Sequence, residues 1–359
     1  MITADGCRSR RRRFLEVLKP TTPVLLGDSL HLRYLANVYV DPLSLSAEFG
    51  ALLLLKPDGH ATLFHDNRLP KTVDRSHIEE RVVLPWYDGQ TPGQGPRGMR
   101  LRPIVDQHGG RVHDSLVDPQ APKIHEILAD LRRVKDEDEI AMLRACMKAT
   151  DAGHAWARAN VHPGMTELDV YAGISAACHR AAGEWAVVYG DFVICPGPGR
   201  RVGPATPRVL RDGELLIVDF SVVLQGYRSD FTNTIAVGGT PSAEQQRLMH
   251  LCLKAMAAGE WELRAGARCQ AVYDAVTKVF AEAGVAEGFP HHAGHGLGVS
   301  HPEAPYIVRE STESLRSGDV ITLEPGLYFD GLGGMRIERN YRITETGFER
   351  LSQHHIGLT

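Results

Sequence analysis

Aspartate side chains occur within β-rich, largely apolar runs, where a charged group is costly. Asp219 lies in the run 215–223, and Asp230 lies in the next run, after the pair Gln225-Gly226. This pair predicts a two-residue hairpin turn that places Asp219 opposite Thr232. Because side chains alternate between the faces of a strand, Asp230 then points to the same face as Asp219. Alone, each aspartate could be a turn or cap residue. As a pair on one buried face, they favour a bound divalent cation or a catalytic role.

Four histidines fall within the eleven-residue segment 291–301, at His291, His292, His295 and His301. Glycines surround His295 in Gly-His-Gly-Leu-Gly, and glycine lets the backbone approach a ligand closely. Imidazole is a common metal ligand and general base. One histidine in a glycine-rich loop is more often structural, but four beside two buried aspartates indicate a site.

Two glutamates belong to the last β-rich region. Glu324 ends the apolar strand 320–323, Glu338 lies in the next strand, and Gly331 is midway between them. If the loop closes symmetrically, the two glutamates are cross-strand partners, although a bulge could shift this register. The alternative for Glu338 alone is an ion pair with Arg336 or Arg339.

Together these patterns predict one metal site built from four carboxylates and one imidazole. The members are Asp219, Asp230, His295, Glu324 and Glu338. So many anions exceed what one buried cation can balance, and they suit two divalent metals about 3.5–4 Å apart with an acidified water between them. Oxygen-rich ligation with one histidine favours manganese, cobalt or zinc.

The elements that must position these residues fall into two regions. Residues 21 to about 130 alternate apolar runs and turn signals, as expected for an α/β unit. We expect strands at 24–26, 82–84 and 102–105, and a hairpin of 50–55 and 61–64 around a turn at 57–59. Helical spacing predicts helices at 124–131, 136–156, 166–182, 242–264 and 268–283, with strands from 214 onward. The domain boundary therefore falls near residue 130. The repeated order of helices before strands suggests an internal duplication.

The composition is that of a soluble globular protein. The chain has 359 residues, of which 43% are hydrophobic and 23% charged, so two domains are expected and a disordered or collagen-like chain is excluded. A formal net charge of −4 lacks the basic footprint of a nucleic-acid binder. No run approaches the roughly 20 apolar residues of a membrane span. We therefore expect neither nucleic acid nor membrane as a partner.

The cysteines and the N-terminus indicate a cytoplasmic protein. Six scattered cysteines without C-x-x-C spacing are typical of reduced core thiols. The basic run 8–13 is followed by a segment that is only half apolar and ends at Pro20, unlike a signal peptide. We interpret it as a short surface helix with a solvated charged face; the alternative is a nucleic-acid-binding arm.

In the order and context of its five candidate ligands, the chain resembles the pita-bread metallopeptidases: methionine aminopeptidase, Xaa-Pro aminopeptidase, prolidase and their creatinase relatives. The second aspartate follows the first by eleven residues, His295 lies in Gly-His-Gly-Leu-Gly, Glu324 in Glu-Pro-Gly and Glu338 in Arg-Ile-Glu. Segments 131–140 and 163–168 are similar to stretches of the family's catalytic domain. The segment 32–35 is similar to the N-terminal domain of the prolidase and creatinase branch.

The resemblance implies an α+β fold, with a creatinase-like α/β domain at 1–130 and a duplicated pita-bread catalytic domain at 131–359. It implies that Asp219, Asp230, His295, Glu324 and Glu338 bind two metal ions, which Asp230 and Glu338 bridge. It also implies hydrolysis of the bond before proline in short peptides by a homodimer. All five ligands are present, unlike in creatinase, which uses this fold without metal.

The resemblance also implies further site residues. Glu324 would transfer the proton of the attacking water, and His301 would stabilise the tetrahedral intermediate. His301 follows His295 by six residues, one fewer than is usual in the family, and a gapless alignment would place Pro302 there instead. His291, Tyr328 and Arg336 would line the substrate site, with His291 acting in catalysis.

One family feature is missing. These peptidases carry a histidine about 17 residues before the first metal aspartate, where this chain has Val202, and no histidine occurs between His179 and His250. Cleavage of the bond before proline, by an Xaa-Pro dipeptidase or aminopeptidase, is nevertheless the first hypothesis. A second is a hydrolase or lyase acting on a small non-peptide metabolite at the same metals. A third is a binding protein that has lost catalysis, which the complete ligand set disfavours.

Overall fold

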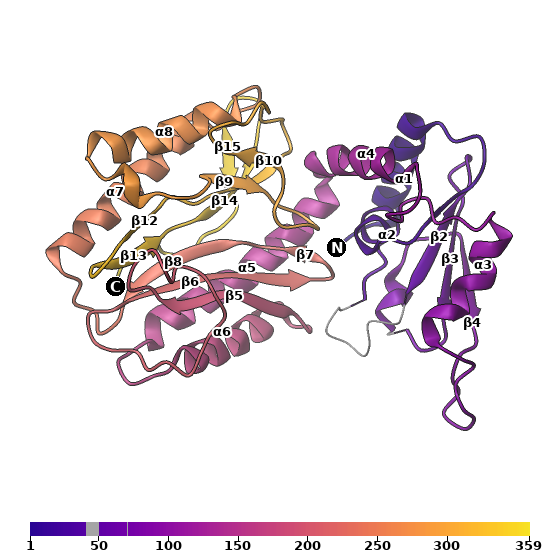
Figure 1. Ribbon diagram of the computed structural model, residues 1–359, viewed down its shortest axis with the longest axis horizontal. Helices are drawn as coiled ribbons and strands as arrows, with labels where there is room; N and C mark the ends of the chain where they lie inside the picture. Colours follow the sequence, from indigo (N-terminus) through magenta and orange to yellow (C-terminus); the bar gives the residue numbers. More distant parts are fainter. Residues whose placement is uncertain (41–49, 70) are drawn as a thin grey trace. The chain divides into compact units, whose positions relative to one another are not determined.

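The computed structural model describes residues 1–40, 50–69 and 71–359, and the chain divides into two compact units, Met1–Arg132 and Arg133–Thr359 (Figure 1). Each unit has its own apolar core. Among the described residues, no helix has both the length and the apolar character that a membrane crossing requires.

The first unit is built on a four-stranded sheet in the order β1-β2-β3-β4. Neighbouring strands are antiparallel except for β3 and β4, which are parallel. Phe14, Tyr34, Leu53 and Leu63 are fully buried in its core. The elements are α1 (Ala4–Leu18), β1 (Val24–Leu26), α2 (Ser29–Ala36), β2 (Ala51–Leu55), β3 (Ala61–Asp66), β4 (Glu80–Leu84), α3 (Arg102–Gln107) and α4 (Ala121–Arg133), with 3-10 turns at Lys71–Arg75 and Arg97–Leu101.

Two expectations for the first unit are wrong. Residues 102–105 were expected as a strand but begin helix α3, because Pro103 occupies the first turn, where a missing N–H costs nothing. The basic run lies on helix α1 as expected, but it is not only a solvated face. Arg10 and Arg11 are buried. Arg10 Nε donates to Tyr34 O at 2.8 Å, and Arg11 Nη2 donates to a Glu79 carboxylate oxygen at 2.8 Å.

The second unit contains two successive sets of helices and strands. In order they are α5 (Glu137–Asn160), α6 (Glu167–Ala182), β5 (Val187–Ile194), β6 (Leu215–Leu224), β7 (Tyr227–Arg228), β8 (Phe231–Ala236), α7 (Ala243–Glu262), α8 (Cys269–Glu282), β9 (Gly294–Gly296), β10 (Glu303–Ile307), β11 (Val320–Leu323), β12 (Gly326–Phe329), β13 (Gly333–Arg336), β14 (Arg339–Ile343) and β15 (Phe348–Arg350). The expected helices are confirmed. Strand β5 was not expected, because Gly190-Asp191 interrupts its apolar pattern.

Helix pairs pack against strands in both of the second unit's two sets. Helices α5 and α6 contact β6 and β5, whereas α7 contacts β11 and α8 contacts β10 (Figure 1). Capping boxes begin α5, α6 and α7, at Asp136, Thr166 and Ser242. In a capping box, two otherwise unpaired backbone N–H groups are satisfied by side chains, so these helix starts are fixed locally.

The first hairpin of this unit has the predicted register. Asp219 on β6 is the partner of Thr232 on β8, and Asp191 on β5 is its partner on the other side. The turn residues Gln225 and Gly226 have φ values of 50° and 88°. Positive φ at both positions is typical of the type I′ turn, whose twist matches that of the strands.

The second hairpin also closes symmetrically. Leu323 pairs with Arg339 in one ladder, and Gly326 pairs with Arg336 in the next. The same register runs through both ladders, so Glu324 and Glu338 lie at corresponding positions in the gap between them. Each uses its backbone N–H elsewhere: Glu324 donates to Ala293 O at 2.8 Å and Glu338 to Thr232 O at 3.0 Å. The bond from Glu338 N to Thr232 O thus joins the second hairpin to the first.

All six cysteines are free and buried. Burial raises the pKa of Cys178 and of Cys269 to about 12, so both are neutral thiols near neutral pH. The prediction that the cysteines are core thiols is confirmed.

Candidate active site

A cavity of about 760 Å³ opens in the second unit where the two hairpins meet. The five candidate ligands, His291, His301 and Arg336 all line it. Further lining comes from Leu168, Tyr171, Val188, Phe192, Val202 and Pro204. The cavity therefore combines a cluster of charged side chains with a largely apolar wall.

Asp219 is held by Arg336 on the neighbouring hairpin. Arg336 Nε donates to Asp219 Oδ2 at 3.0 Å, and a second contact runs from Nη2 to the same oxygen. Nη2 also donates to Asp191 Oδ2 at 2.9 Å. Burial raises the pKa of Asp219 to about 7, opposed by the charge of Arg336. The buried guanidinium therefore orients two facing carboxylates.

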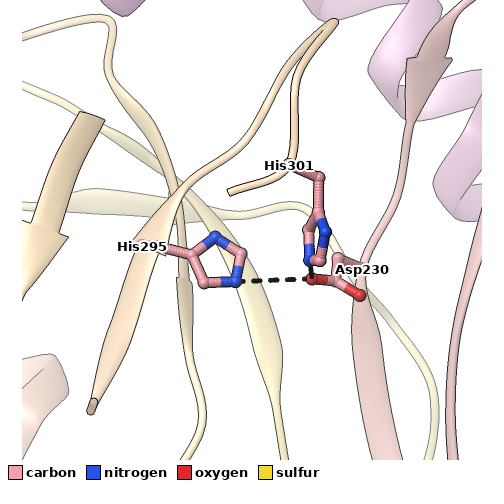
Figure 2. A group of neighbouring side chains, drawn as sticks. All are labelled: Asp230, His295 and His301. Atoms are coloured by element: carbon pink, nitrogen blue, oxygen red, sulfur yellow. Dashed lines mark ion pairs between the residues drawn. The ribbon is translucent and has the colours of Figure 1, made fainter. Parts of the chain in front are cut away.

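Asp230 lies between two imidazoles, as Figure 2 shows. His301 Nε2 is 2.5 Å and His295 Nε2 is 3.6 Å from Asp230 Oδ2. Burial alone would raise the pKa of Asp230, but attraction to His301 and His295 outweighs it and lowers the pKa. His301, rather than Pro302, thus supplies the second imidazole at this carboxylate.

His295 presents one ring nitrogen to the carboxylates. Its Nδ1 lies 3.0 Å from Gly296 O, and its Nε2 is 3.5 Å from Glu324 Oε1. Because Nδ1 must donate to the carbonyl, Nε2 of the neutral ring keeps a lone pair. Burial lowers the pKa of His295, which favours this neutral form. A hydrogen bond at the far nitrogen of this kind orients metal-binding histidines.

Glu324 is surrounded by donors. His292 Nε2 lies 3.0 Å from its Oε1, to which Thr322 Oγ1 also donates at 3.1 Å. Burial would raise the pKa of Glu324, but the hydrogen bond from His292 and the nearby histidines outweigh burial and hold the pKa well below its usual range. Glu324 is therefore an anion in the absence of any cation.

Glu338 is the one carboxylate of this group with a buried oxygen that has no partner. Thr232 Oγ1 donates to its Oε2 at 2.7 Å, while Oε1 is without a hydrogen bond. The alternative ion pairs are not formed, because Arg336 engages Asp219 and Arg339 engages Glu260. Burial and repulsion from Asp230 and Glu324 raise the pKa of Glu338 well above its usual value.

The donor set fits divalent metal. Three overlapping groups each place one ligand atom per residue within 4.8 Å of the others: Asp219, Asp230 and Glu338; Asp230, His295 and His301; and His292, His295 and Glu324. Buried carboxylates this close repel one another, and an unsatisfied buried oxygen is costly. A cation beside Glu338 Oε1 would remove both costs.

The remaining predicted residues form a chain behind the ligands. His291 Nε2 lies 3.1 Å from the Tyr328 hydroxyl, which accepts from Arg336 Nη1 at 2.9 Å. Burial lowers the pKa of His291 to about 4. His291 and Arg336 line the cavity, whereas Tyr328 is buried and contacts both of them through its hydroxyl.

Sequence reasoning missed Asp191 and His292. Asp191 lies in the unexpected strand β5, opposite Asp219, and carried no signal of its own. His292 belongs to the histidine cluster, so its contact with Glu324 could have been considered. Val202, at the position of the missing histidine, lines the cavity with 59% of its surface exposed.

The comparisons with known proteins agree with this geometry. A family model described as metallopeptidase family M24 matches residues 141–345, more than half of the chain. The chain belongs to this family. The expected family is thereby confirmed.

Among M24 relatives, the probable dipeptidase PepE of Mycobacterium tuberculosis is 37% identical over 221 residues, which are 60% of this chain and 58% of PepE. An uncharacterized peptidase of Staphylococcus saprophyticus is 30% identical over 227 residues, 62% of this chain and 63% of that protein. The chain thus spans about three fifths of the length of these curated relatives.

Solved structures extend the similarity to the whole chain. Dipeptidase PepE from Mycobacterium ulcerans is 27% identical with a TM-score of 0.75, over 100% of this chain and 98% of that one. The Xaa-Pro dipeptidase from Bacillus anthracis has a TM-score of 0.77 at 22% identity, over 99% of both chains. The predicted α+β pita-bread fold is confirmed.

Proposed function

We propose that this M24 protein is a dinuclear-metal-dependent peptidase that cleaves the bond before proline in short peptides. The observation that carries the proposal is the buried set of four carboxylates and one imidazole, in which Glu338 Oε1 has no protein partner. The dipeptidases PepE and the Xaa-Pro dipeptidase among its relatives support the substrate class.

The residues that would hold the metal are Asp219, Asp230, His295, Glu324 and Glu338. Bound divalent ions would polarise the scissile carbonyl and acidify a water molecule. Manganese, cobalt and zinc suit this oxygen-rich set.

The chain's own residues would handle the protons and the developing charge. Glu324 is an anion that can accept the water proton and pass it to the leaving nitrogen. The attraction of Asp230 raises the pKa of His301 despite its burial, so His301 can donate a hydrogen bond to the oxyanion. Burial keeps His291 neutral, which suits a hydrogen bond to an uncharged part of the substrate. Arg336 orients Asp219.

The apolar wall of the cavity suits a proline ring. Leu168, Tyr171 and Phe192 lie on the same cavity as the ligand set. The proline ring carries no N–H donor, so an apolar wall leaves no polar group of the ring unpaired. We further propose residues 1–130 as the creatinase/prolidase-like domain and 131–359 as the catalytic domain, in a cytoplasmic homodimer.

A second candidate follows from Val202. An apolar, exposed side chain at the place of the missing histidine removes a donor near the scissile bond. A hydrolase or lyase acting on a small non-peptide metabolite would use the same ligands without it.

Metal analysis and a substrate screen test the proposal. Protein loaded with manganese or cobalt should hold about two ions per chain and cleave Xaa-Pro dipeptides faster than dipeptides without proline. Folded, metal-loaded protein that cleaves no proline peptide would exclude it. Turnover of non-peptide amides alone would support the second candidate.

A further inference from the structure

Arg201 presents a guanidinium to the cavity without a carboxylate partner among the residues that the structure describes. It lines the cavity, its Nη1 donates to Pro198 O at 3.3 Å, and its guanidinium carbon lies 6.0 Å from the centre of the Tyr328 ring. Arg336, the other arginine of the lining, is held by two carboxylates. A guanidinium has five N–H donors, so most of those of Arg201 remain available.

The backbone that carries Arg201 is fixed on both sides. Before it, Arg200 Nη2 donates to the buried Glu167 carboxylate at 2.7 Å. After it, Gly203 N donates to Asp191 Oδ1 at 2.8 Å, and Gly203 O accepts from Phe192 N at 3.2 Å. The backbone of this segment is therefore held in place before a ligand arrives, so binding does not have to order the chain around Arg201.

Arg201 lies close to the reacting groups. The Tyr328 ring, which faces it, carries the hydroxyl that joins His291 to Arg336, and Arg336 holds Asp219. A dipeptide whose scissile carbonyl lies at the carboxylate set carries its free carboxylate only two bonds beyond the leaving nitrogen. Guanidinium groups bind carboxylates through paired, charge-assisted hydrogen bonds.

We propose that Arg201 binds the free α-carboxylate of the leaving residue and thereby restricts the substrate to dipeptides. This inference rests on the proposed function and assigns its specificity to the segment where the family's histidine is missing. A longer peptide would move its carboxylate by one residue, roughly 3.5 Å, and leave an uncharged amide at Arg201.

The test compares Ala-Pro, Ala-Pro-amide and Ala-Pro-Ala as substrates. The wild-type protein should prefer Ala-Pro over Ala-Pro-amide by about 10- to 100-fold in kcat/KM, because a hydrogen-bonded charge pair is lost with the amide. Arg201→Ala should lose this preference, mainly through a higher KM for Ala-Pro, with little change for Ala-Pro-amide. Arg201→Lys should keep part of it. Arg247→Ala, on α7 outside the cavity, should match the wild type.

Two outcomes would overturn the inference. One is an Arg201→Ala variant that still prefers the free acid as the wild type does. The other is loss of the preference in Arg228→Ala instead; Arg228 has a buried unpaired Nε and lies over the Tyr189 ring, 5.5 Å from its centre. If the metal-loaded wild type cleaves no peptide, the proposed function fails. The role of Arg201 can then still be tested by calorimetric binding of Ala-Pro and of Ala-Pro-amide. Equal affinities for the two would exclude carboxylate binding by Arg201.

Discussion

The unpaired oxygen of Glu338 is the strongest single-residue evidence for a metal site. Buried polar atoms in folded proteins nearly always have a partner, and this one faces three other acidic side chains. Without a cation, burial and repulsion keep the Glu338 carboxyl protonated. An occupied site requires the anion, so binding of metal must release this proton.

The variant Glu338→Gln distinguishes the protonated, metal-free state of this residue from the ionised, metal-binding state. Because glutamine resembles the protonated acid, the metal-free variant should unfold within a few degrees of the metal-free wild type. It should lose bound metal and more than about 100-fold of the activity, which exceeds the usual cost of losing an outer-shell partner. Metal analysis, turnover and thermal unfolding check this. Glu345→Gln, at an exposed position, is the matched control, and unchanged metal content in Glu338→Gln would contradict the ligand assignment.

The residue-level prediction from sequence was strongest where a local rule applied. The Gln225-Gly226 turn determined that Asp219 faces Thr232, and hairpin symmetry determined the positions of Glu324 and Glu338. The contact of His301 with Asp230 could not be predicted, because it depends on the path of a loop. Asp191 could not be predicted either, because its role arises only from the pairing of β5 with β6.

At the scale of elements, helix α5 supports the strands from beneath the site. His154 on α5 is buried, and its Nε2 donates to Phe231 O at 3.0 Å, next to Asp230. Its ring lies 4.8 Å from that of Phe220, next to Asp219. Burial lowers the pKa of His154 to about 4, so the folded protein holds it neutral.

This arrangement predicts sensitivity to acid. Between pH 6.5 and about 4, the unfolded chain binds a proton at His154 that the folded chain does not, so stability falls as pH falls. The loss from this group should be about 2 kcal/mol between pH 7 and pH 5. In His154→Gln, the pH dependence of the unfolding free energy should weaken by that amount, measured with denaturant. The exposed control His250→Gln should keep the wild-type dependence, and an identical dependence in His154→Gln would refute the argument.

The predictions of helices and strands were wrong where a second local preference outweighed the apolar pattern. Residues 102–105 have the apolar character of a strand, yet Pro103 suits the first turn of a helix and α3 forms. Strand β5 lacks a continuous apolar pattern because of Gly190, and it is stabilised by pairing with β6 and packing against α6. Long helices such as α5 and α7 were predicted well, because their periodic spacing spans many residues.

At the scale of the whole molecule, the proposed ligands all belong to the second of two compact units. They come from both hairpins and from β9, which carries His295, so bound metal would crosslink parts of the chain that are far apart in sequence. The first unit has a separate core. Ligand binding stabilises only the parts whose opening releases the ligand.

Chelation should therefore act on one unit. Removal of metal should accelerate amide hydrogen exchange in β6, β8 and β11 and leave β1, β2 and β3 unchanged. Exchange measured by mass spectrometry, with and without a chelator, checks this for each peptide. Equal acceleration in both units, or none in the second, would contradict the proposed placement of the metal.

The six buried cysteines can report local opening of the structure, because each becomes reactive only when it is exposed. Thiolates react with alkylating reagents, whereas thiols that are neutral and enclosed do not. Cys7 belongs to the first unit and the other five to the second. Alkylation of the cysteines in native protein, followed by peptide mapping, would therefore show which of the two units opens transiently. No introduced probe is needed.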